Sequence, residues 1–216
     1  MITLSFVEVF TYLLLAARWT LALSAIAFLG GGGGAVLLLM VRYAYDSKAA
    51  WAVNWYTALI QGTPLLLQLF LVFFGLPLMG IDVSPLLAAG VALTLYASAY
   101  LAEIWRGCVD AIPKGQWDAS ASLGMNFLAQ MRFVILPQAL RIALPPTVGF
   151  LVQLIKSTAL ASIIGFSELI RASQILANAT FQPFQIYGAV AIIYFAICYP
   201  LTIGSRVLER KLSQSN

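Results

Sequence analysis

One lysine in an otherwise apolar stretch is the residue of this chain with the clearest chemical potential. Lys156 stands within residues 142–164, which are mostly aliphatic, and Ser157 and Thr158 follow it directly. A charge inside a long apolar span is costly, so such a residue is a candidate for function by default. An ammonium group beside two hydroxyls offers a positive charge and hydrogen-bond donors to a carboxylate. The alternative is a lysine that pairs with an acid or extends to the membrane surface.

A second polar set lies in another apolar stretch, residues 86–105. Ser98 and Tyr100 bring hydroxyls, and Glu103 brings a carboxylate near the end of the stretch. All three are candidates for binding a polar solute. Helix packing is the open alternative, because small polar residues also hold membrane helices together and Glu103 can pair with Arg106.

A third pair, Glu168 and Arg171, lies one helical turn apart in the partly polar segment 167–182. We expect this pair to shape a helix at the outer surface, since opposite charges at this spacing stabilise a helix. A role in gating is the alternative interpretation.

The composition argues against an enzyme. The chain has no histidine, and its two cysteines, Cys108 and Cys198, lack the spacing of metal ligands. The sequence also lacks a Gly-x-x-x-x-Gly-Lys-Ser/Thr phosphate loop. We therefore expect no catalytic site, metal or cofactor in this chain, and we interpret both cysteines as packed side chains.

The same composition indicates a membrane protein. Of 216 residues, 62% are hydrophobic and only 9% are charged, whereas a soluble domain has about 25% charged residues. The length fits one helical bundle without a separate ATPase or solute-binding domain. The predicted fold is an all-α integral membrane protein with a single domain, residues 1–216.

Five stretches are apolar and long enough to cross a bilayer as helices. The first, residues 19–41, contains the glycine run Gly30–Gly34, which allows close packing of another helix or else weakens its own. Residues 1–17 form a lead-in or a short outer helix. The remaining elements are a short oblique helix and four spans, at 51–60, 64–79, 86–105, 142–164 and 184–204.

The distribution of basic residues predicts the orientation, because lysine and arginine concentrate on the cytoplasmic side. Only Arg18 and Arg171 fall on the opposite side of the predicted spans. Nine of the twelve basic residues fall on one side: Arg42, Lys48, Arg106, Lys114, Arg132, Arg141, Arg206, Arg210 and Lys211. The N-terminus is therefore predicted outside, and the C-terminus and the loop 106–141 inside.

Residues 115–137 are too polar for a span and too regular for a linker. Ala119–Ser122 favour a helix, Gly124 breaks it, and Asn126 can cap a second short helix. Leu136-Pro137 is predicted to end that helix. This pattern predicts a helix-turn-helix at the membrane surface, with Trp117 and Phe127 exposed.

The same stretch resembles the signature loop of ABC-importer permeases. That pattern is Glu-Ala-Ala, three residues, Gly, nine residues, Ile-x-Leu-Pro. Here it reads Asp118-Ala119-Ser120, Gly124 and Val134-Ile135-Leu136-Pro137. The spacing is complete, and the three departures (Asp for Glu, Ser for Ala, Val for Ile) are chemically close.

The resemblance implies that the loop, about residues 106–141, docks a separate ATPase subunit. The docking residues that it implies are Gln116, Trp117, Asp118, Ala119, Ser120, Gly124, Leu136 and Pro137. Three further segments are similar to the amino-acid branch of the family: Gly62-Thr63-Pro64, Ser98–Ile104 and Lys156–Ser162.

Membership of that branch implies a permease in the bacterial inner membrane. Its partners would be two ATPase subunits that bind ATP and Mg²⁺, a second permease, identical or homologous, and an extracytoplasmic solute-binding protein. No acid accompanies Lys156, so we predict an acidic or neutral polar L-amino acid as substrate. The alternatives are a permease of another ABC-importer branch and a channel or secondary transporter that needs no ATPase.

Overall fold

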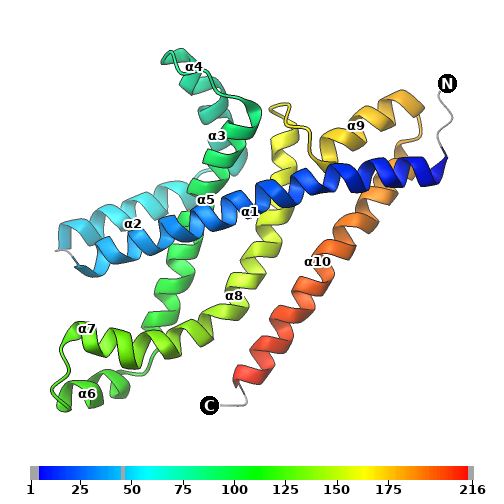
Figure 1. Cartoon of the computed structure of the whole chain (residues 1–216). Helices are drawn as coiled ribbons and strands as arrows, with labels where there is room; N and C mark the ends of the chain where they lie inside the picture. The colour runs from blue at the N-terminus through cyan, green and yellow to red at the C-terminus, as the bar shows by residue number, and fades with distance from the viewer. Residues whose placement is uncertain (1–4, 45–46, 214–216) are drawn as a thin grey trace.

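The computed structural model describes residues 5–44 and 47–213, which are helical apart from short connections (Figure 1). Three of the elements are not α-helices: the π-helical turns η1 and η2 and the 3₁₀ helix η3. In chain order the elements are α1 (Phe6–Ala44), α2 (Ser47–Gln61), α3 (Leu65–Phe70), η1 (Leu71–Gly75), α4 (Leu76–Leu78), α5 (Pro85–Asp110), α6 (Lys114–Ser122), α7 (Phe127–Gln130), η2 (Met131–Ile135), α8 (Leu136–Ser157), η3 (Thr158–Ser162), α9 (Leu169–Thr180) and α10 (Pro183–Ser213).

Four helical stretches of the described chain are long and apolar enough to cross a membrane: Phe6–Tyr43, Pro85–Asp110, Phe127–Ser162 and Pro183–Leu212. A fifth forms if α2 and the α3–α4 segment count as one span, which bends by 99° after Gln61. The predicted all-α membrane fold is confirmed. Residues 6–17 continue directly into the first span, so the structure favours a lead-in over a separate outer helix.

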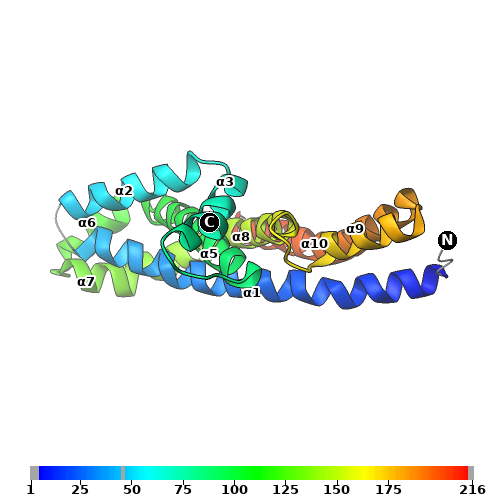
Figure 2. The ribbon, with the colours of Figure 1, turned by 90° about the horizontal axis from the view of Figure 1, so that it is seen from above.

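The glycine run of α1 packs against α5, the central helix of the bundle (Figures 1 and 2). A Cβ added at Gly31 would stand 2.4 Å from the Cβ of Ala97, and one at Gly34 would stand 2.8 Å from that of Ser98. Gly33, on another face, has no atom within 4 Å of such a Cβ. The glycines therefore serve close helix packing on one face only, as small residues do in membrane helices.

We expect Gly31→Ala to destabilise the protein by about 1–3 kcal/mol, because its methyl group overlaps Ala97 and forces the two helices apart. Gly33→Ala is the matched control and should leave stability unchanged or slightly raised, since alanine favours a helix. Thermal unfolding in detergent compares the two variants. Equal melting temperatures would contradict the packing role.

A continuous helical path leads from α7 through η2 into α8. The prediction that Leu136-Pro137 ends the helix is wrong. Pro137 lies within this path, directly after the π turn Met131–Ile135, which changes the hydrogen-bond register at the point where the proline lacks an N–H.

Inside α8, Pro145 and Pro146 lack the N–H groups that would donate to the carbonyls of Arg141 and Ile142. The carbonyl of Pro145 accepts from the hydroxyl of Ser205 on α10 at 2.8 Å.

Candidate functional site

The turn between α6 and α7 has the predicted helix-turn-helix form. Gly124 has φ +75°, a left-handed conformation that favours glycine. Around it, the N–H of Met125 donates to the carbonyl of Ser120 at 3.3 Å, which closes the end of α6. The side chain of Asn126 then accepts from the N–H of Ala129 at 2.9 Å and caps α7. Both turn residues therefore act as the sequence predicts.

Exposed residues of α6 and of the turn that follows it form a surface, here called the α6 surface. It consists of Gln116, Asp118, Ala119, Leu123 and Gly124. Leu123 was not among the predicted docking residues, and 79% of it is exposed. The sequence signal for Leu123 is an apolar side chain directly before Gly124, at a turn where an exposed apolar residue suggests a contact with a partner.

Two predicted docking residues lie inward instead. Ser120 is buried, and its hydroxyl donates to the carbonyl of Trp117 at 2.9 Å. Trp117 is half-buried, and its ring stacks on Phe127 with centroids 6.4 Å apart, so the expectation that Trp117 is exposed is wrong. Leu136 and Pro137 are exposed but belong to the start of α8.

The candidates on α5 have partners within the protein. The hydroxyl of Ser98 lies 2.7 Å from that of Tyr56 and donates to the carbonyl of Leu95 at 2.8 Å. The ring of Tyr100 stacks on Phe150 of α8, with centroids 5.6 Å apart and an interplanar angle of 13°. Tyr100 is thus the α5 candidate that contacts α8.

Glu103 forms an ion pair near the C-terminal end of α5. Its carboxylate accepts from Arg106 at 2.7 Å, and Arg106 also bonds Asp110 at 2.7 Å. The hydroxyl of Thr57 on α2 donates to the second oxygen of Glu103 at 3.4 Å. This arrangement matches the alternative in which Glu103 pairs with Arg106.

Lys156 lies in the last turn of α8, further along its helix than a span that starts at residue 142 implies, because α8 begins at Leu136. The side chain is exposed, and no hydrogen bond or ion pair joins it to another residue of the described ranges. The Ser157 hydroxyl donates to Gln153 at 2.9 Å, and that of buried Thr158 donates to Ile155 at 2.7 Å. Lys156 is therefore the member of this triplet free to meet a solute.

Glu168 is fully buried where α9 starts. One carboxylate oxygen accepts from the N–H of Arg171 at 2.9 Å, and the other accepts from the hydroxyl of Thr20 on α1 at 3.2 Å. Burial raises the pKa of the Glu168 carboxyl, against the opposite effect of these hydrogen bonds. Glu168 thus caps α9 and joins it to α1.

Sequence reasoning missed Thr20 and Tyr56. Thr20 is buried, and it also accepts from the N–H of Leu169 at 3.2 Å. The only sequence signal for Thr20 was its polar side chain within the apolar residues 19–41. The interpretation of Cys108 and Cys198 as packed side chains is confirmed, since both are buried and unbridged.

Comparisons with known proteins agree with this architecture. Residues 39–214 match the family described as binding-protein-dependent transport system inner membrane component. The chain is 36% identical over 205 residues to the probable amino-acid ABC transporter permease protein YckA of Bacillus subtilis (strain 168), covering 95% of this chain and 91% of YckA. It is 36% identical over 197 residues to the L-cystine transport system permease protein TcyB of the same strain, covering 91% and 84% of the two chains. The crystal structure of an amino acid ABC transporter with histidines superposes with a TM-score of 0.90 at 31% identity, over 97% of this chain and 100% of that chain.

Proposed function

From the premise that this chain belongs to the binding-protein-dependent transport system inner membrane component family and is an amino-acid ABC transporter permease subunit, we propose that it forms the translocation path for an acidic or neutral polar L-amino acid. The chain is not an enzyme by itself. The observation that supports ATP-driven transport is the exposed α6 surface beside the turn at Gly124. Its residues have the spacing of the signature loop of ABC-importer permeases.

A partner ATPase supplies the energy in this proposal. The groove of that subunit receives the α6 surface together with Leu136 and Pro137, and ATP and Mg²⁺ bind to the partner. Trp117 supports this surface from within, because its ring stacks on Phe127 and so fixes α6 against α7. The hydrogen bond of Ser120 to the Trp117 carbonyl lies within α6. Two ATPase subunits, a second permease and an extracytoplasmic binding protein complete the complex.

The substrate assignment depends on Lys156. An ammonium group without an acidic partner among the described residues favours the carboxylate of the amino acid. The hydroxyls of Ser157, Thr158 and Ser98 already donate to backbone carbonyls, so in this proposal they hold the helices around Lys156 rather than bond the carboxylate. Tyr100 stands beside this path through its contact with Phe150. Glu168 and Arg171 shape the start of α9 in this proposal, since the carboxylate of Glu168 caps that helix; gating is the alternative role for this pair.

Uptake by the reconstituted complex tests this function. Proteoliposomes that contain the permease, its ATPase and ATP inside should accumulate L-glutamine or L-glutamate when the binding protein is added outside. Accumulation should stop without ATP or without the binding protein. A clear preference for L-arginine or L-lysine would refute the substrate class, and uptake without the ATPase would refute the ATP-driven mechanism.

The proposed orientation has the N-terminus outside and α6 in the bacterial cytoplasm. Asp82 and Ser122 are both exposed, at the α4–α5 connection and at the end of α6. In a background with alanine at Cys108 and Cys198, Asp82→Cys should react with an impermeant maleimide in intact spheroplasts. Ser122→Cys should react only after permeabilisation. Reaction of both variants from the same side would exclude this topology.

A further inference from the structure

Two polar side chains share one exposed face of the membrane-spanning helix α8. Gln153 stands three residues before Lys156, so the two lie on the same face about one turn apart, and both are exposed. Gly149, one turn earlier, leaves this face open, since a Cβ there would meet no atom within 4 Å. Polar groups within a span almost always face a protein interior or a water-filled path rather than lipid. This face is therefore the part of α8 that a polar solute can reach.

Three aromatic rings pack beside Gln153. The ring centroid of Phe150, one turn before it on α8, lies 6.0 Å from that of Tyr96 and 5.6 Å from that of Tyr100 on α5. The two tyrosine rings lie 4.5 Å apart, and the Tyr96 hydroxyl has the side chains of Tyr100 and Gln153 within hydrogen-bonding reach. Since Tyr96 and Phe150 are buried, this contact ties the amide of Gln153 to the packed interface of α5 and α8.

The amide of Gln153 suits a group that both donates and accepts hydrogen bonds. A primary amide has two N–H donors and an acceptor oxygen, so one contact with Tyr96 leaves groups of both kinds available. A carboxamide on a substrate complements such an amide with one N–H···O bond in each direction. A carboxylate has acceptors only, so it offers no donor to the Gln153 oxygen. Hydrogen bonding therefore favours a carboxamide over a carboxylate beside Gln153.

The charges on α5 and α8 favour the same class of substrate. Lys156 pairs with the α-carboxylate in the proposed function, and a second carboxylate needs a second cation. Arg106, the basic residue of α5, is bonded to Glu103 and Asp110. Arg141, the other basic residue of α8, lies fifteen residues before Lys156, about 22 Å along the helix. The α-ammonium group is common to acidic and neutral amino acids and does not discriminate between them.

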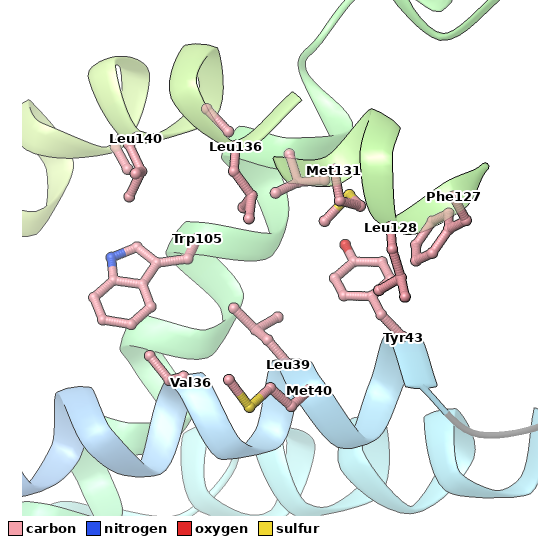
Figure 3. A pocket seen from close by; sticks show the side chains of 13 residues that line it. Val36, Leu39, Met40, Tyr43, Trp105, Phe127, Leu128, Met131, Leu136 and Leu140 are labelled. Carbon is pink, nitrogen blue, oxygen red and sulfur yellow. The ribbon is translucent and has the colours of Figure 1, made fainter. Parts of the chain in front are cut away.

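The groove between α1 and the start of α8 offers no comparable partners (Figure 3). Its volume is about 670 Å³, and apolar side chains such as Met40, Trp105 and Leu140 line it. None of the residues that line it is charged, whereas a free amino acid carries both a carboxylate and an ammonium group. An amino acid would lose its hydration there without gaining an ion pair. The polar face of α8 is therefore the better site for this solute.

We propose that Gln153 binds the side-chain carboxamide of the substrate, so that this permease carries L-glutamine or L-asparagine rather than an acidic amino acid. Lys156 binds the α-carboxylate of the same molecule. Residues three apart on a helix have Cβ atoms about 5–6 Å apart, a spacing that a short amino-acid side chain spans. This inference rests on the proposed function and narrows its substrate class.

Equilibrium binding of radiolabelled L-glutamine and L-glutamate to the purified permease–ATPase complex, without the binding protein, tests the inference. L-Glutamine should bind about tenfold more tightly, because L-glutamate leaves one hydrogen-bonding group of the site without a partner. Gln153→Met should remove this preference by weakening the binding of L-glutamine. Equal or tighter binding of L-glutamate to the wild-type complex, or binding of neither, would overturn the inference. ATP-driven uptake of L-glutamate would still uphold the proposed function in that case.

A change of charge at the same position tests for a gained property. Gln153→Lys supplies the second cation and should shift the binding preference toward L-glutamate by about tenfold or more, which a merely structural role of Gln153 does not produce. The matched control is Gln182→Lys, which adds the same charge at an exposed glutamine between α9 and α10 and should keep the wild-type preference. An unchanged preference in Gln153→Lys, or an equal shift in both variants, would contradict the assignment. Gln153→Met keeps the test decisive if Gln153→Lys does not assemble, since methionine is apolar like the rest of the span.

Discussion

We expect Lys156→Met to lower ATP-driven uptake by about ten- to hundredfold, because a hydrogen bond to a charged group contributes about 1.5–3 kcal/mol. Methionine keeps an apolar side chain of similar length and removes only the charge. Lys156 is exposed and has no acidic partner in the described ranges, so its loss leaves no carboxylate unpaired inside the bundle. The complex should therefore still assemble. Uptake of labelled L-glutamine into proteoliposomes measures the effect.

The matched control is Lys48→Met, which removes an exposed lysine near the start of α2. It should leave uptake within about twofold of wild type, since exposed charges contribute little to stability. Parallel measurement of ATP hydrolysis separates loss of the substrate contact from loss of the complex. Normal uptake by Lys156→Met would remove Lys156 from the proposed path.

Gly124→Val should abolish co-purification of the ATPase. A Cβ at this position would meet no atom within 4 Å, so the effect is one of backbone conformation alone. Valine at φ +75° is strained by about 1–2 kcal/mol or more, and a shift to negative φ re-aims α6 relative to α7. Pull-down of the ATPase from detergent-solubilised membranes and transport by the same complex measure the loss.

Gly124→Asn separates conformation from side-chain size. Asparagine tolerates the left-handed region and has a longer side chain than valine. It should therefore retain most ATPase binding and transport. If the valine variant binds and transports normally, this turn is not the docking element, and if both variants fail equally, side-chain size rather than φ decides.

The sequence predicted best what short-range signals determine. Gly124 and Asn126 act within a few residues of themselves, and the structure has both as expected. The prediction that Pro137 ends the helix was wrong, because that rule does not consider a π turn directly before the proline. The spans could be predicted from composition, because the bilayer requires long apolar stretches whatever their particular contacts are.

The errors and omissions come from contacts between distant segments. Trp117 is half-buried because Phe127, beyond the turn, lies against its ring. The partner of Ser98 is Tyr56 on α2, and Glu168 bonds Thr20, which is 148 residues away. A single sequence contains no periodic signal for such pairs, so they emerge only from the packed structure.

The unbroken path from α7 into α8 places the proposed docking turn and Lys156 at the two ends of one helical segment. From Phe127 to Lys156 the chain rises about 44 Å at about 1.5 Å per residue. Beyond Pro137, the path contains Pro145-Pro146, where the carbonyl of Pro145 accepts from the hydroxyl of Ser205 on α10. In the proposed mechanism, a tilt of the longer arm, residues 127–145, reaches Lys156 on the shorter arm only as far as the hydrogen bond between Ser205 and Pro145 holds. If the proposed ATPase contact moves this turn, the stiffness of the helix at Pro145-Pro146 sets how much of that movement reaches Lys156.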